Sequence, residues 1–193
     1  AGFAGLRLSM TLSAGNADQL RAVADLADRL ALELGIVAVH GMATHLHLDR
    51  EPAPADATAV AADMQAVITR WLRSWNPRRW LRAHFAWWTW RRMVGRPRRF
   101  RCGAGRDFIF VQADGTVHSC SVDGVALGDL TTQRWDEIAA GEAMARARKA
   151  ARTCRRACWM ICTARSVYRA APARVAAWCL WAKLRAHAGR LPL

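Results

Sequence analysis

The chain has 193 residues, of which 53% are hydrophobic, and its formal net charge is +14. This length and apolar content allow one large or two small domains with buried cores, and they exclude an intrinsically disordered chain. The longest uncharged stretch, residues 34–48, is too short for a membrane-spanning helix. Because the sequence begins without a methionine or a signal peptide, we expect a cytoplasmic fragment of a longer protein that can also lie peripherally on the membrane.

The positive charge is concentrated in two segments. Residues 64–106 and 143–193 each carry 12 basic and no acidic side chains, whereas the segments between and before them are acidic overall. Nearly all of the basic residues are arginine, which suits bidentate contacts with phosphate or carboxylate groups. A coding bias towards arginine explains the same excess without a function, and composition alone leaves both explanations open.

The first predicted elements form a strand–helix–strand unit. Residues 6–12 alternate like a strand, a helix follows with Asn16 as its N-cap and Gly35 just after its end, and residues 36–40 form an apolar strand. A helical crossover implies that the two strands pair in parallel. Because one such unit cannot bury both faces of its sheet, we expect an α/β fold in which residues 1–75 are the tail of a partial (βα) barrel.

A second amphipathic helix is predicted over 55–75, with Trp71 and Trp75 on its apolar side. Arginine and aromatic side chains then alternate over 76–101, which we expect to be a connector or lid. An anionic membrane surface or a nucleic acid would also suit this composition. We favour the lid, then the membrane, because no recognised nucleic-acid motif accompanies the charge.

A β-hairpin is predicted in the second half of the chain. Residues 108–111 and 116–119 flank Ala113-Asp114-Gly115, which has the chemistry of a tight turn. Cys102 precedes the first strand and Cys120 follows the second. Because antiparallel pairing returns both ends to one place, we expect these two thiols to meet at the open end of the hairpin.

Helices are predicted after the hairpin. Gly128-Asp129-Leu130 indicates a second turn, and residues 133–152 have a helical composition. Residues 166–193 are predicted to form a basic amphipathic tail helix that is interrupted at Pro172. Within it, Cys179 lies beside a tryptophan and is predicted to be an ordinary core cysteine.

Two further cysteines complete a candidate metal site. Cys154 and Cys158 are four residues apart, so one helical turn would point both thiols to the same side, towards Cys102 and Cys120. Iron–sulfur clusters need four converging thiolates, and zinc accepts the same set. Buried free cysteines or disulfides are the alternatives, although six cysteines without a secretory signal favour metal binding. The flanking residues are basic: Arg101, Arg152, Arg155 and Arg156.

The spacing over residues 100–165 is specific as a set. Twelve residues separate Cys102 from Gly115, four separate Gly115 from Cys120, and paired cysteines follow. Cys102-Gly-Ala-Gly, Gly128-Asp-Leu ahead of a Trp-Asp-Glu-Ile helix, and Cys154-Arg-Arg-Ala-Cys158-Trp-Met support it. This set resembles the auxiliary-cluster region of radical S-adenosylmethionine (SAM) enzymes with a C-terminal SPASM or Twitch domain. Residues 6–40 are similar, less specifically, to the last part of the radical SAM partial barrel.

The resemblance implies a small α+β, Twitch-like domain over 102–165 that binds one auxiliary [4Fe–4S] cluster. The implied ligands are Cys102, Cys120, Cys154 and Cys158, with Cys162 as the alternative to one of the last pair. A full SPASM domain carries two clusters and needs more cysteines than the five in this region.

One part of the family pattern is missing. Radical SAM chemistry needs a Cys-x3-Cys-x2-Cys loop for the cluster that cleaves SAM, and Cys154-x3-Cys158-x3-Cys162 is one residue too long. We therefore expect that this chain alone does not cleave SAM. In the intact enzyme, a second [4Fe–4S] cluster and SAM would generate a 5′-deoxyadenosyl radical that modifies a small-molecule, lipid or peptide substrate.

Two other interpretations stay open. The chain is then either a non-catalytic four-cysteine zinc module that binds an acidic partner, or an Arg/Trp-rich membrane-surface protein with inert cysteines. His40, His45 and His47 are further candidate metal ligands, but polar residues at a strand exit are the simpler interpretation because no carboxylate partner is evident.

Overall fold

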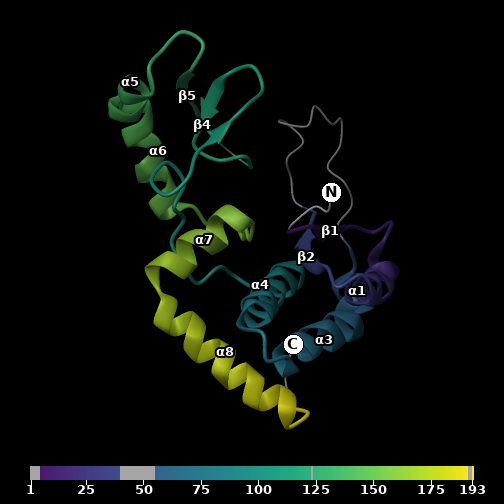
Figure 1. Cartoon of the computed structure of the whole chain (residues 1–193). Coiled ribbons are helices and arrows are strands. Elements are labelled where there is room, and N and C mark those ends of the chain that lie inside the picture. The colour runs from purple at the N-terminus through teal and green to yellow at the C-terminus, as the bar shows by residue number, and fades with distance from the viewer. Residues whose placement is uncertain (1–4, 40–54, 123, 191–192) are drawn as a thin grey trace. The chain divides into compact units, whose positions relative to one another are not determined.

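The computed structural model describes residues 5–39, 55–122, 124–190 and 193, and it is a mixed α/β structure with small sheets (Figure 1). The chain divides into two compact units. The first unit comprises the described parts of 1–39, 52–96 and 170–193, and the second comprises the described parts of 97–169. His40, His45 and His47 lie outside the described residues.

The first unit contains a two-stranded sheet covered by helices. Its elements are β1 (Arg7–Leu12), the 3₁₀ helix η1 (Ala17–Gln19), α1 (Leu20–Arg29), β2 (Glu33–Ala38), α3 (Ala57–Arg73), α4 (Pro77–Met93) and α8 (Pro172–His187). β1 pairs with β2 in parallel, with Met10 opposite Ile36, so the predicted strand–helix–strand unit is confirmed. The partial barrel to which it would belong stays a prediction.

The helix between β1 and β2 begins and ends at other residues than the sequence predicted. Asn16 does not cap it, because its side chain accepts a hydrogen bond from Ser13 N (2.9 Å) and donates one to the Thr11 carbonyl (3.0 Å). These bonds close the turn after β1 instead. Gly35 lies inside β2, because α1 ends earlier and Ala31 takes the left-handed conformation there, with φ 52°.

α3 supplies much of the core of the first unit. Asp56 begins it by accepting a hydrogen bond from Thr58 N at 2.9 Å, which satisfies a free backbone donor of the first turn. Its inward face is fully buried at Val60, Met64, Val67, Ile68 and Leu72. Trp75, predicted to share this face, is 86% exposed, because α3 ends before it at Arg73.

Most of the segment expected to be a connector is the helix α4. Asn76 caps it by accepting a hydrogen bond from Arg78 N at 3.0 Å, and Pro77 occupies the first turn. α4 contacts α3, β2 and α8, and the side chains it buries most completely include the small Ala83 and Ala86, which allow close approach. Residues 77–93 and the tail helix α8 lie in the first unit.

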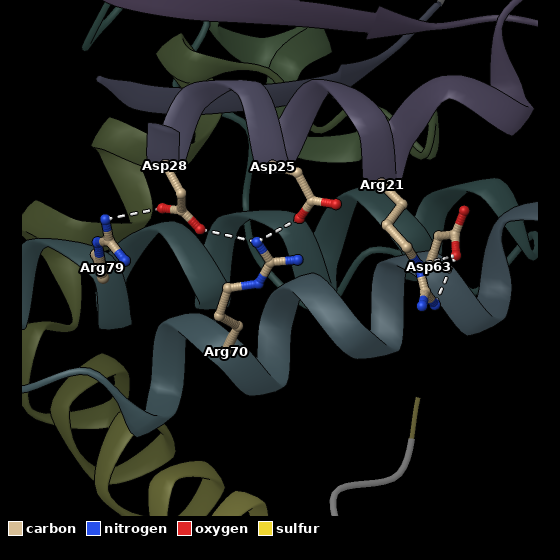
Figure 2. Close-up of polar contacts among 6 residues, drawn as sticks. All are labelled: Arg21, Asp25, Asp28, Asp63, Arg70 and Arg79. Carbon is tan, nitrogen blue, oxygen red and sulfur yellow. Dashed lines mark hydrogen bonds and ion pairs between the residues drawn. The ribbon is translucent and has the colours of Figure 1, made fainter. Parts of the chain in front are cut away.

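Ion pairs join α1 to the next two helices (Figure 2). Arg70 on α3 contacts both Asp25 and Asp28 of α1 at 2.8 Å. Asp28 also pairs with Arg79 of α4 at 3.0 Å. Part of the arginine excess of residues 64–106 is thus neutralised by the acidic segment that precedes it.

The second unit combines a three-stranded sheet with helices. Its elements are β3 (Phe110–Val111), β4 (Thr116–His118), β5 (Ala126–Asp129), α5 (Trp135–Ala140), α6 (Glu142–Thr153) and α7 (Ile161–Ala170). The strands are antiparallel in the order β3-β4-β5, which confirms the predicted hairpin. Its turn has Gly115 at φ 92°, and Asp114 Oδ1 accepts a hydrogen bond from Thr116 N at 2.9 Å.

Two features of this unit differ from the prediction. Gly128 and Asp129, expected in a turn, belong to β5, whose Leu127 packs on Val117 in the small core. The single helix predicted over 133–152 is divided at Gly141, where the backbone is extended (φ −67°, ψ 155°). α5 and α6 thereby reach the core with separate side chains, Ile138 and Met144.

Candidate metal centre

One cavity of the second unit is lined by all four of the cysteines predicted to be ligands: Cys102, Cys120, Cys154 and Cys158. Its volume is about 270 Å³. A single water needs only about 10–15 Å³, so this space is large enough for a polyatomic group. Much of the remaining wall is apolar: Ala104, Phe108, Val122, Val125, Ala147, Ala151 and Met160.

Cys102 and Cys120 are held by tight turns at the open end of the hairpin. After Cys102 the chain folds back, since the Gly103 carbonyl accepts a hydrogen bond from Asp107 N at 2.7 Å. A Cβ at Gly103 would lie 2.2 Å from Asp107 Oδ2, and a Cβ at Gly124 would lie 2.0 Å from the Cys120 carbonyl oxygen. The contact at Gly103 is with a side chain that can move, whereas the contact at Gly124 is with backbone, so the turn at Cys120 requires glycine.

Cys154 and Cys158 reach the cavity without the helical turn that the spacing predicted. Cys154 ends α6 with a non-helical backbone (φ −58°, ψ 123°), and Cys158 lies in the irregular segment before α7. α7 begins only at Ile161, where Thr163 Oγ1 accepts a hydrogen bond from Met160 N at 2.8 Å. This bond to the start of the helix fixes where the irregular segment ends.

Cys162 does not line this cavity. It sits on α7 and lines a separate cavity of about 200 Å³, together with Asp107, Phe108 and Arg165. Burial is the main cause that raises the pKa of its thiol, and the thiols of Cys102 and Cys120 act in the same direction. Cys179 is buried in the first unit, where its thiol contacts the Trp80 carbonyl, so its predicted place in a core is confirmed.

The thiols of the larger cavity affect one another electrostatically. Burial is the main cause that raises the pKa of Cys158, and the neighbouring thiols of Cys154 and Cys120 act in the same direction. Arg98 opposes them and lowers that pKa. Thiols with raised pKa values must lose their protons to become metal ligands, so a metal would displace protons from this site.

Among the side chains around the four thiols, Arg98 indicates most directly which kind of group the cavity suits. It lines the cavity, and its Nη2 donates a hydrogen bond to the Cys154 carbonyl. Its Nη1 is buried and has no hydrogen-bond partner among the residues that the structure describes. A buried charged donor is stable only with a partner, so the cavity suits an anionic group. Four thiols and a cation around one cavity supply the donor types of a thiolate-ligated iron–sulfur cluster.

The four thiols share one cavity wall, but they do not converge as a site for a single metal ion. Within 5–39, 55–122, 124–190 and 193, no three histidine, cysteine or acidic side chains form a group that could hold one ion. Of the arginines that the sequence pointed to, Arg155 and Arg156 line the cavity with the cysteines, and Arg101 and Arg152 do not. Arg98 was missed because its sequence neighbourhood is uniformly rich in arginine and gives it no distinguishing signal.

Comparison with known proteins gives one match. Residues 102–163 match the family model of the SPASM domain, described as an iron–sulfur cluster-binding domain. No curated protein and no solved structure matches the chain. The match begins at the first cysteine of the cavity and includes the other three. The resemblance predicted for this segment is therefore confirmed: it matches a SPASM iron–sulfur cluster-binding domain, consistent with a SPASM or Twitch domain of a radical SAM enzyme.

Proposed function

We propose that this chain is the C-terminal part of a radical SAM enzyme and binds one auxiliary [4Fe–4S] cluster through Cys102, Cys120, Cys154 and Cys158. The observation that carries the ligand set is that these four thiols line one cavity, whereas Cys162 lines another. The SPASM match supports the kind of group bound. When bound, such a cluster supplies one-electron transfer to the site.

The residues of the chain give this cluster a mostly apolar site. Val125 from the loop before β5, Ala147 and Ala151 from α6, and Met160 from the segment before α7 form parts of the wall. Such a wall restricts water at the sulfur atoms, and exposure to solvent is one of the factors that set the potential of a cluster. A hydrolytically sensitive cluster would also last longer there.

Metal analysis of the full chain tests the proposal. After anaerobic purification and reconstitution, we expect about four iron and four acid-labile sulfide per chain, with the charge-transfer absorption of a [4Fe–4S] cluster. Cys120→Ser and Cys158→Ser lose this cluster, and Cys162→Ser, a cysteine of the same unit, retains it. The ligand set is wrong if Cys162→Ser loses the cluster while Cys158→Ser keeps it. About one zinc per chain without sulfide would instead favour a zinc module that binds an acidic partner.

A second function is favoured by one face of α8. Leu180, Trp181 and Leu184 are 57%, 45% and 73% exposed, and their spacing places them side by side on the helix. Arg185 lies 5.6 Å from the Trp181 ring, and residues 143–193 contain no acidic side chain. Among the described residues no helix is long and apolar enough to cross a membrane. We propose that this face lies on an anionic membrane surface.

Vesicle co-sedimentation tests this second proposal independently of any metal. The full chain should bind phosphatidylserine-containing vesicles and bind phosphatidylcholine vesicles much less, and added salt should weaken the binding. Trp181→Ser with Leu184→Ser removes the binding. Leu30→Ser, which changes a leucine that is 54% exposed at the end of α1, does not. Equal binding by both variants would overturn the assignment of this face.

A further inference from the structure

We propose that Arg98 is a positioning residue that donates a hydrogen bond from Nη1 to a sulfur atom of the bound cluster and thereby raises the cluster's reduction potential. This inference rests on the proposed function. It goes beyond that function because nothing in the SPASM match assigns a role to residue 98, which lies outside the matched segment.

Two contacts fix the guanidinium of Arg98 beside the thiols. Nη2 donates to the carbonyl of Cys154, which is itself one of the proposed ligands. The guanidinium carbon lies 5.6 Å from the centre of the Phe100 ring, and that ring packs edge-on against Trp159 at 5.4 Å. The side chain is thus anchored to the ligand backbone at one nitrogen and supported by aromatic rings.

The other terminal nitrogen, Nη1, lacks a hydrogen-bond acceptor among the described residues. This nitrogen is buried, while the side chain as a whole lines the cavity that holds the four thiols. Leaving a buried charged donor unpaired is unfavourable, so a native site normally supplies an acceptor. Thiolate and sulfide sulfurs of a cluster are acceptors, and they carry the complementary negative charge.

The charge of Arg98 acts on the same cavity. Its guanidinium is always protonated, and the side chain lines the cavity together with the four thiols. A cation at this position stabilises additional negative charge in the cavity. Reduction adds one electron to a cluster that is already anionic, and a nearby cation in a low-dielectric site favours the reduced form. Arg98 therefore raises the reduction potential.

The shape of arginine matters as well as its charge. The planar guanidinium presents two terminal nitrogens in different directions, so Nη2 can stay on the Cys154 carbonyl while Nη1 donates to a second acceptor, whereas a lysine ammonium is a single point of charge on a flexible chain. Arg98→Lys thus keeps the charge and loses the two-directional contact. Arg98→Met loses both.

Redox titration of the reconstituted full chain separates these contributions. Arg98→Met is compared with Arg99→Met, which removes an exposed arginine next in the sequence that does not line the cavity. We expect a more negative potential for Arg98→Met, an intermediate one for Arg98→Lys, and no change for Arg99→Met. The electron paramagnetic resonance spectrum of the reduced cluster should change in Arg98→Met and stay unchanged in Arg99→Met.

The outcomes distinguish this inference from the proposed function. If the unaltered chain takes up no iron and sulfide, the proposed function fails and no potential can be measured. If it loads and Arg98→Met has the unaltered potential and spectrum, the role of Arg98 is overturned. If Arg98→Met folds but does not take up the cluster, the potential of Arg98→Lys is the deciding measurement. A potential equal to that of the unaltered chain would show that the hydrogen bond from Arg98 does not exist. Failure of both variants to load, with intact circular dichroism, would assign Arg98 to cluster assembly instead of tuning and overturn the inference.

Discussion

The indole nitrogen of Trp88 donates a hydrogen bond to Nε2 of His84, 3.2 Å away on the same helix. His84 is only 4% exposed, and its ring packs edge-on against Trp178 of α8 at 4.8 Å. The hydrogen bond requires an unprotonated Nε2, so the imidazole is neutral with its proton on Nδ1. Burial lowers the pKa of His84 to about 4.

This histidine makes the first unit sensitive to acid. In the unfolded chain the histidine pKa is near 6.5. Between pH 6.5 and 4 the unfolded state is therefore protonated at this histidine, whereas the folded state is not. Stability therefore falls as pH falls through this window, by roughly 3 kcal/mol in total. Urea unfolding followed by tryptophan fluorescence at pH 7 and pH 4.5 measures it. His84→Gln should flatten the dependence, and a control at the exposed His187, His187→Gln, should not. An unchanged pH dependence in His84→Gln would refute the assignment.

Asp28 holds three helices of the first unit together through its two arginine partners (Figure 2). Its side chain is about one third exposed, so solvent screens these pairs but does not abolish them. Asp28→Asn should lower the free energy of unfolding by about 1 kcal/mol, and less in high salt. As the control, Asp136→Asn removes a pair to Arg134 that is far more exposed, and it should have almost no effect. Equal losses from the two variants would show that the network adds nothing.

Glycine at position 124 is required for the turn that carries Cys120. An added Cβ would lie 2.0 Å from the Cys120 carbonyl oxygen and 2.7 Å from its nitrogen, and backbone atoms cannot move aside as a flexible side chain can. Gly124→Ala should therefore displace this ligand and lower the iron and sulfide content of the reconstituted chain. Gly15→Ala, whose Cβ meets nothing closer than 4.0 Å, is the matched control. Full loading of Gly124→Ala would contradict this account of the turn.

The convergence of Cys102 with Cys120 was predictable because it follows from a local rule. A tight Asp-Gly turn and two alternating strands set the register of a hairpin, which returns its two ends to one place. The turn between Gly103 and Asp107, which brings Cys102 back to that place, was not predicted. For Cys154 and Cys158 the predicted helical turn was wrong, since α6 ends at Thr153, before both residues. Their arrival at the same cavity depends on how the segment before α7 packs, and no short-range pattern encodes that.

The role of α4 was hidden by its composition. Its arginine and aromatic residues suggested a connector or a lid with aromatic residues in its core, yet the helix buries Ala83 and Ala86 almost completely, while Trp87 and Trp90 are only partly buried against the core. Sequence patterns weight large apolar residues most, so they miss an interface built on small ones. Arg98 was equally hidden, because a buried unpaired nitrogen is visible only in three dimensions.

Lys183 shows what one compact cation does in a chain whose basic residues are nearly all arginine. Its Nζ donates to the carbonyls of Leu72 and Ser74, at 2.8 and 2.9 Å, and so caps the end of α3 from α8. The ammonium also lies 4.7 Å from the centre of the Trp80 ring. Lys183→Met should lower the free energy of unfolding by about 1–3 kcal/mol, because two carbonyls lose a charged donor.

Chemical denaturation tests the role of Lys183 with two comparisons. Lys183→Arg should recover only part of the lost stability, since a planar guanidinium cannot direct its donors to both carbonyls from the position of a point charge. Lys149→Met changes an exposed lysine of α6 and should have little effect. Full recovery by Lys183→Arg would show that charge alone matters at this position, and equal losses in the two methionine variants would show that the cap contributes nothing to the docking of α8.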